Sequence, residues 1–162
     1  RYDMSALLRE ISVAAGSQKL IAGQVADLEA EGKSVQRRQL QFIHENKTSA
    51  ILTSSVRLGA MSANADGRKL SAITQFGQRL GLAFQVIDDI LDVTQTSEIL
   101  GKSAGKDVAA KKATYPAVIG LEKSRVEAKR LTRGAHNALS IFSGRDAEAL
   151  HALANYLLER EY

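Results

Sequence analysis

A single proline, Pro116, stands in the 162 residues of this chain, and this shortage limits the fold more than any other feature of the sequence. Proline breaks helices and is frequent in turns, so a chain almost without it can form long helices. Apolar residues recur at spacings of three and four along most of the chain, without strand-like alternation of useful length. We therefore predict an all-α fold, a bundle of about six to eight helices with roughly 60% or more of the residues helical.

Turn residues separate the expected helices. The sequence Glu31–Gly32–Lys33–Ser34 predicts a loop, and Asp66, after a short turn, is a candidate N-cap for the longest helix. Pro116 is expected to open the helix near Tyr115. Two helices are expected on either side of a break at Gly16–Ser17. Further helical segments are expected at about 37–47, 48–63, 68–93, 115–142 and 146–160.

Composition excludes several kinds of site and partner. The chain has no cysteine and only three histidines, which excludes thiolate zinc sites and favours oxygen ligands and a hard cation such as Mg²⁺. The net charge of +4 is spread along the chain, which suits an anionic small molecule and gives no pattern for nucleic-acid binding. No apolar run is long enough to span a membrane and no signal peptide is visible, so we expect a cytoplasmic protein.

Three aspartates interrupt an apolar helical stretch. Asp88 and Asp92 are expected on one face a single turn apart, with Asp89 beside them and Gln85 pointing the same way. Aspartate is a poor residue inside a helix, and three unpaired carboxylates repel one another, so this pattern favours a bound cation. The alternative is a solvated acidic face, which the flanking apolar residues make less attractive. The sequence therefore predicts a Mg²⁺ site that leaves positions open for phosphate oxygens.

Lysines before and after the aspartates in the sequence could bind a phosphate group. Lys102 lies in a glycine-containing segment after the aspartates, and Lys112 follows it. Upstream, Lys47 and Thr48 mark an expected helix junction, where an ammonium and a hydroxyl could bind the same anion. Each lysine alone is more simply a surface residue. Together with the aspartates they form a charge-complementary set, provided that the bundle brings them together.

These motifs resemble those of the trans-isoprenyl (polyprenyl) diphosphate synthases, and most closely the short-chain farnesyl and geranylgeranyl enzymes. The resemblance covers about residues 15–160 in the family's order. It implies the isoprenoid-synthase type of helix bundle. The segments that carry it are Ala22-Gly23-Gln24-Val25-Ala26-Asp27-Leu28, Ile43-His44-Glu45-Asn46-Lys47-Thr48, Gly81 to Asp92, Leu100 to Asp107 and Lys112 to Pro116.

The resemblance implies a function for each motif. Asp88, Asp89 and Asp92 would hold a Mg²⁺ that bridges the allylic diphosphate. Thr48 and Gln85 would lie beside the ionising carbon. The residues expected to contact or support the diphosphate and its metal are Lys47, Lys102, Lys112 and Asp107, with Gln24 and Asp27 in the wall of the site. In this family an allylic diphosphate loses pyrophosphate, and the resulting cation is attacked by the double bond of isopentenyl diphosphate.

The first aspartate-rich motif and the basic residues that bind isopentenyl diphosphate in this family are absent. We therefore expect residues 1–162 to be the C-terminal half of a single all-helical synthase domain. This half is expected to be inactive alone, and the domain that includes the N-terminal half is expected to form a homodimer. One alternative is a non-catalytic half-synthase or regulatory subunit. Another is a class I terpenoid cyclase, although its Asn–Ser/Thr–Glu metal motif is not evident.

Overall fold

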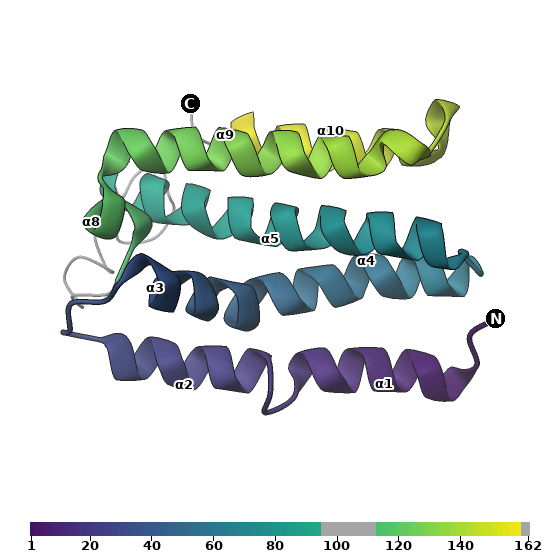
Figure 1. The fold of residues 1–162 in the computed structure, drawn as a ribbon, viewed down its shortest axis with the longest axis horizontal. Helices are drawn as coiled ribbons and strands as arrows, with labels where there is room; N and C mark the ends of the chain where they lie inside the picture. Colours follow the sequence, from purple (N-terminus) through teal and green to yellow (C-terminus); the bar gives the residue numbers. More distant parts are fainter. Residues whose placement is uncertain (95–112, 160–162) are drawn as a thin grey trace.

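The computed structural model describes residues 1–94 and 113–159, and this part of the chain is all-α, without a β-strand (Figure 1). The predicted fold class and helical content are confirmed. The α-helices are α1 (Met4–Ala15), α2 (Leu20–Ala30), α3 (Arg37–His44), α4 (Ala50–Ser62), α5 (Gly67–Thr94), α8 (Tyr115–Ile119), α9 (Leu121–Ala138) and α10 (Glu148–Glu159). A π-helical turn, η1 (Glu45–Ser49), joins α3 to α4, and the 3₁₀ turns η2 (Leu139–Ile141) and η3 (Gly144–Ala147) lie between α9 and α10.

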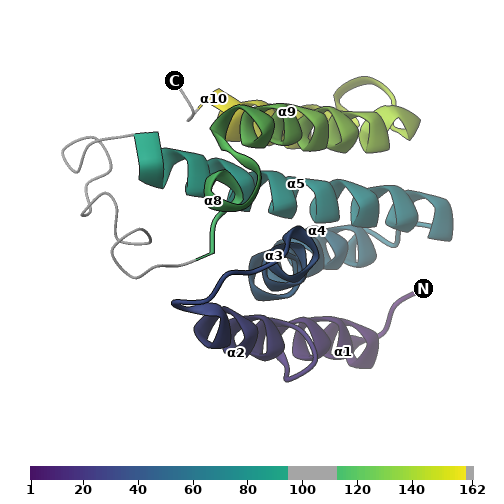
Figure 2. The same ribbon diagram turned by 60° about the vertical axis from the view of Figure 1, so that its left-hand side comes forward.

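The helices form stacked layers around α5. In Figure 1, α1 and α2 follow one another along one edge, and α3, η1 and α4 form the next layer. The long helix α5 packs against α4 on one side and against α9 on the other. The second view shows the short helix α8 beside the end of α5 that carries the aspartates (Figure 2). That end of the bundle therefore brings together α3, α5 and α8.

Several predicted boundaries are confirmed by their capping contacts. Asp66 Oδ1 accepts a hydrogen bond from the Lys69 backbone N–H at 2.8 Å at the start of α5. The break at Gly16 separates α1 from α2. Thr114 caps α8 through a 3.3 Å bond from the Ala117 N–H, and Pro116 lies in its first turn, where no amide donor is needed.

Two expected boundaries differ from the structure. The segments 37–47 and 48–63 do not form separate helices, because the backbone runs through the π-helical turn η1 without a loop. The expected helical stretch 115–142 has an internal boundary that was not predicted, at Gly120, whose φ of +87° lies in the region that favours glycine. The change of direction at Gly120 separates the short α8 from α9.

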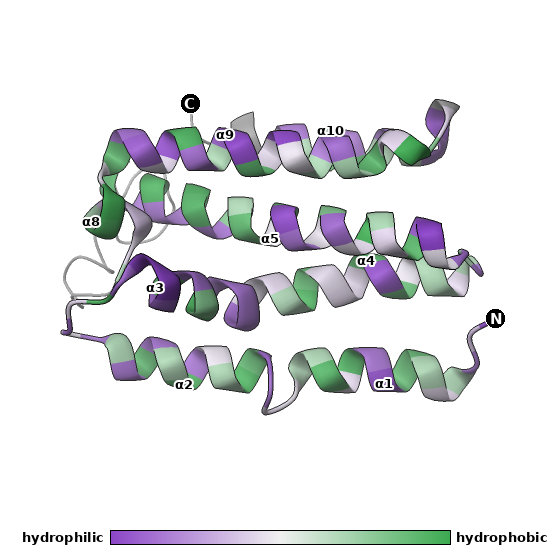
Figure 3. Ribbon diagram, viewed as in Figure 1, coloured by the Kyte–Doolittle hydropathy of each residue, from purple (hydrophilic) through white to green (hydrophobic). Residues whose placement is uncertain are grey.

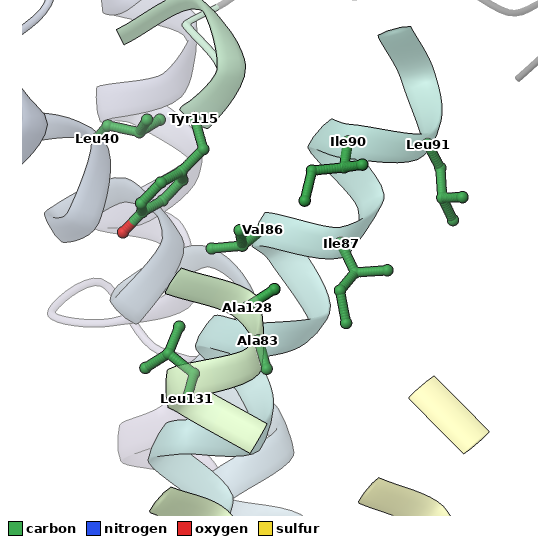
Figure 4. Close-up of a cluster of buried hydrophobic side chains, with 9 residues drawn as sticks. All are labelled: Leu40, Ala83, Val86, Ile87, Ile90, Leu91, Tyr115, Ala128 and Leu131. Carbon is green, nitrogen blue, oxygen red and sulfur yellow. The ribbon is translucent and has the colours of Figure 1, made fainter. Parts of the chain in front are cut away.

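Two clusters of buried apolar residues fill the bundle. The first lies at the α8 end of α5 and is drawn in Figure 4. It consists of Leu40, Ala83, Val86, Ile87, Ile90, Leu91, Tyr115, Ala128 and Leu131. The second cluster joins the first half of α5 to α9 and α10 through Ile73, Phe76, Leu80, Ala135, Ala138, Leu139, Ala147, Ala154 and Leu157. α5 is therefore buried on most sides along its length, and its aspartates lie among apolar neighbours.

Apolar side chains are also exposed on α1 and α2, where Figure 3 shows green segments along both helices. The most exposed of them are Met4, Leu8, Val13, Val25 and Leu28, each with about half or more of its surface accessible. None of the helices described has the length and apolar character required to cross a membrane.

Candidate functional site

The three aspartates lie in the last turns of α5 and differ in their surroundings. Asp92 is 7% exposed, and its Oδ2 is buried without a hydrogen-bond partner among residues 1–94 and 113–159. Asp88 is half-buried one turn earlier on the same helix. A buried carboxylate oxygen without a partner is unfavourable, and a cation is one way to satisfy it.

Asp89 is already used by the fold. Its side chain is also 7% exposed, and Oδ2 accepts the backbone N–H of Tyr115 at 2.8 Å. The same oxygen lies 3.7 Å from Nε2 of His44. Asp89 thus ties the end of α5 to the first residue of α8.

His44 is a residue of this site that the sequence prediction missed. It is 5% exposed, its ring lies 5.4 Å from the ring of Tyr115 between centroids, and its Nδ1 has no hydrogen-bond partner in the described residues. Burial lowers the pKa of His44 to about 4; Asp27 opposes this effect and Lys47 adds to it. The imidazole is therefore neutral near pH 7. Its position after the buried Leu40 and Ile43, at helical spacing, was the available signal.

Lys47 projects from the π-helical turn η1 and is paired with Asp27 of α2. The distance from Lys47 Nζ to Asp27 Oδ2 is 2.5 Å, and the lysine side chain is one-third exposed. Thr48, next in the same turn, is half-buried, as is Gln85 on α5. The ammonium is therefore held by a carboxylate and remains partly accessible to solvent, so a more highly charged anion could compete for it.

The structure pairs Lys47 with Asp27 of α2, and it brings Asp89 near His44. Asp89 Oδ2 lies 3.7 Å from Nε2 of His44, three residues before Lys47, and this distance is too long for a hydrogen bond. Lys102, Lys112 and Asp107 lie outside the described residues. That Asp88 and Asp92 share one cavity with Lys47 and Lys102 therefore remains a prediction.

A cavity of about 820 Å³ lies between α1, α4 and α5 and reaches Glu45 and Ser49 of η1. Its wall includes Arg57, which donates two hydrogen bonds to Glu10 at 2.7 and 2.9 Å. Its wall also includes Thr53 and Ser54, whose buried hydroxyls have no hydrogen-bond partner in the part of the chain that the structure describes. None of the aspartates of α5, nor Lys47, lines this cavity. We do not assign the diphosphate site to it, because the charge-complementary residues do not contribute to its wall.

The donor groups fit Mg²⁺ held jointly with a ligand. The described residues contain no group of three or more histidine or carboxylate side chains arranged to hold a metal. Mg²⁺ is commonly bound through one or two carboxylates, the remaining positions being filled by water and substrate phosphates. Asp88 and the buried Oδ2 of Asp92, which has no partner among the residues described, supply hard oxygen donors of that kind. Within residues 1–94 and 113–159, these oxygens therefore fit a Mg²⁺ that takes its remaining ligands from outside this part of the chain.

Comparison with known proteins identifies the family. Residues 3–153 match the family described as Polyprenyl synthetase. The chain belongs to this family. It is 46% identical over 153 residues to the chloroplastic geranylgeranyl pyrophosphate synthase of Catharanthus roseus, covering 94% of this chain and 43% of that protein. It is 42% identical over 161 residues to the farnesyl diphosphate synthase of Escherichia coli K12, covering 98% of this chain and 54% of that protein.

A solved relative extends the likeness to the fold. The geranyltransferase of Helicobacter pylori, crystallised with magnesium and isoprenyl diphosphate, superposes with a TM-score of 0.80 at 32% identity. The match covers 96% of this chain and 51% of that one. This polyprenyl synthetase chain thus has the isoprenoid-synthase helix bundle, and it spans about half the length of the relatives it matches.

Proposed function

We propose that this chain supplies the second aspartate-rich, Mg²⁺-diphosphate-binding half of a prenyltransferase that joins an allylic diphosphate to isopentenyl diphosphate. Residues 1–162 would form the C-terminal half of one synthase domain. The observation that carries the proposal is the buried Oδ2 of Asp92, which has no hydrogen-bond partner in the described part of the chain and lies one turn from Asp88 on a helix otherwise packed in the core. The names of the relatives, farnesyl and geranylgeranyl diphosphate synthases, support the choice of substrates.

The proposed reaction breaks the bond between the allylic carbon and its diphosphate oxygen. The electron pair of that bond leaves with pyrophosphate, and the double bond of isopentenyl diphosphate attacks the allylic cation. Loss of a proton to the departing pyrophosphate then completes the new chain. When bound, Mg²⁺ would offset the negative charge that builds on the leaving group.

The protein's own residues would bind and orient the diphosphate. Lys47 would exchange Asp27 for a phosphate oxygen, since a diphosphate carries more charge than one carboxylate. Thr48 and Gln85 present a hydroxyl and an amide dipole that could face the developing cation. Asp88 and Asp92 would hold the metal. Asp89, occupied by the Tyr115 amide, would contribute chiefly by fixing α8. Lys102 and Lys112, outside the described residues, are proposed as further diphosphate contacts.

A fusion protein tests this proposal. In the fusion, this chain replaces the matching part of the E. coli farnesyl diphosphate synthase, and product is measured from labelled isopentenyl diphosphate and geranyl diphosphate. We expect Mg²⁺-dependent product, and a loss of about 10²–10³ in kcat for the Asp88→Ala fusion, typical of one lost electrostatic contact in a transition state. Asp146→Ala, at the far end of the bundle, is the matched control. A folded fusion without activity, or full activity after Asp88→Ala, would contradict the proposal.

A further inference from the structure

Lys47 and Thr48 lie in an unusual piece of backbone, the π-helical turn η1 (Glu45–Ser49). π-Helical turns are rare, and they occur mostly as single turns inserted in α-helices, frequently at functional sites. Such a turn is wider than an α-helical one and is less stable alone, so contacts from neighbouring elements must hold it. In this chain α2 packs against η1 from one side and α5 from another.

Gly23 forms the contact from α2. A methyl group built on this residue would lie 2.6 Å from Cα of Lys47 and 2.8 Å from the carbonyl carbon of Asn46. These are backbone atoms, so no side-chain rotation can relieve the overlap. Any larger residue at position 23 must displace the part of the turn that carries Lys47.

Gly81 forms the contact from α5. A methyl group there would lie 2.5 Å from Cα of Ser49 and 2.6 Å from its hydroxyl oxygen. The two glycines therefore allow α2 and α5 to close directly on the backbone of the π-helical turn, at residues on either side of Thr48.

Two buried side chains complete the support of the turn. Asn46, 5% exposed, donates its side-chain amide to the Phe42 carbonyl at 2.8 Å, one turn earlier on α3. Ser49, 3% exposed, donates its hydroxyl to the Gln78 carbonyl of α5 at 3.1 Å. The turn is thus fixed at both ends by packing and by hydrogen bonds.

We infer that Gly23 and Gly81 are positioning residues, whose lack of a side chain lets α2 and α5 clamp the π-helical turn and so fix Lys47 for diphosphate binding. The inference rests on the proposed function for its ligand, although the clamp itself follows from the packing. It assigns to these glycines a role that acts through Lys47, without contact to the substrate.

The test compares three glycine-to-alanine variants of the present chain. Gly23→Ala and Gly81→Ala each place a methyl group against the backbone of the π-helical turn. Gly77→Ala is the matched control, because its methyl group would lie 2.8 Å from Cα of Thr53, one turn along the same α4–α5 interface and outside η1.

Inorganic pyrophosphate is titrated calorimetrically with Mg²⁺, and thermal unfolding is measured for each protein. We expect pyrophosphate affinity to fall about tenfold or more in Gly23→Ala and Gly81→Ala, and to change by less than about threefold in Gly77→Ala at similar loss of stability. Equal affinity loss in all three, or no loss in the first two, would overturn the inference.

A second readout separates this inference from the proposed function. Amide-proton exchange at Lys47, Thr48 and Ser49 should accelerate in Gly23→Ala and Gly81→Ala more than in Gly77→Ala. If wild type does not bind pyrophosphate, the proposed function fails, whereas exchange still decides whether the clamp exists. If the alanine variants do not fold, Ser49→Ala removes only the bond to Gln78. Faster exchange in this turn after Ser49→Ala would support the clamp, and unchanged exchange would contradict it.

Discussion

Acid should destabilise this chain through His44 in particular. The ordinary pKa of histidine is 6.5, and burial lowers that of His44 to about 4 in the folded chain. Above pH 6.5 the ring is neutral in both the folded and the unfolded states, so the pKa difference does not change the free energy of unfolding. As the pH falls below 6.5 the unfolded state takes up a proton that the folded state cannot, and stability is lost until about pH 4.

The structure sets the size of this effect. The difference between 6.5 and about 4, at about 1.4 kcal/mol per pKa unit, gives a maximum loss of about 3 kcal/mol. His44→Gln removes the titrating group and keeps a neutral polar side chain at the site. Wild type should therefore lose up to about 3 kcal/mol more than His44→Gln between pH 7 and pH 4, whatever the variant costs at pH 7.

Urea unfolding at a series of pH values, with EDTA present to exclude metal, measures the difference. With a urea dependence of about 1–3 kcal/mol per molar, the wild-type midpoint should fall by about 1–3 M more than that of His44→Gln. The NMR titration of the His44 ring in the folded protein should have its midpoint near 4. Parallel pH dependence in the two proteins, or a ring that titrates near 6.5, would refute this explanation.

Two further predictions follow from the helix faces. Arg57→Ala removes the paired hydrogen bonds to Glu10 and the bond to Thr74, and it should lower the free energy of unfolding by about 2 kcal/mol. Arg125→Ala, which removes an exposed ion pair, should lower it by less than about 0.5 kcal/mol. Equal midpoints of the two variants in chemical denaturation would contradict this prediction. The exposed apolar residues of α1 and α2 predict self-association. Sedimentation velocity should show association that weakens with dilution and is reduced by Leu8→Glu together with Leu28→Glu; a monomer at all concentrations would contradict this prediction.

The sequence predicted those parts of the structure that depend on local chemistry. The cap at Asp66, the break at Gly16 and the first turn at Pro116 depend on residues a few positions apart, and each is confirmed. Helical spacing also gave α5 as one long helix with Asp88 and Asp92 on the same face.

The features that the sequence did not predict depend on contacts between distant residues. Asp89 was predicted as a metal ligand alone, and its bond to the Tyr115 amide depends on α8 returning to the end of α5. The π-helical turn depends on close packing by Gly23 and Gly81, and no local pattern distinguishes it from an α-helical turn. The pKa of His44 is lowered chiefly by burial, which depends on the packing of α3 against α5 and α8.

The most direct test of the central claim is calorimetric titration of this chain with inorganic pyrophosphate, with and without Mg²⁺. We expect binding that requires Mg²⁺ and that Asp88→Asn and Asp92→Asn each weaken strongly. Asp146→Asn, an exposed carboxylate at the other end of the bundle, should leave binding unchanged. Because each substitution removes one negative charge, the comparison separates metal binding from a general change in charge. Binding that is independent of Mg²⁺, or that survives the loss of Asp88 and Asp92, would contradict the assignment of this helix face to a magnesium diphosphate.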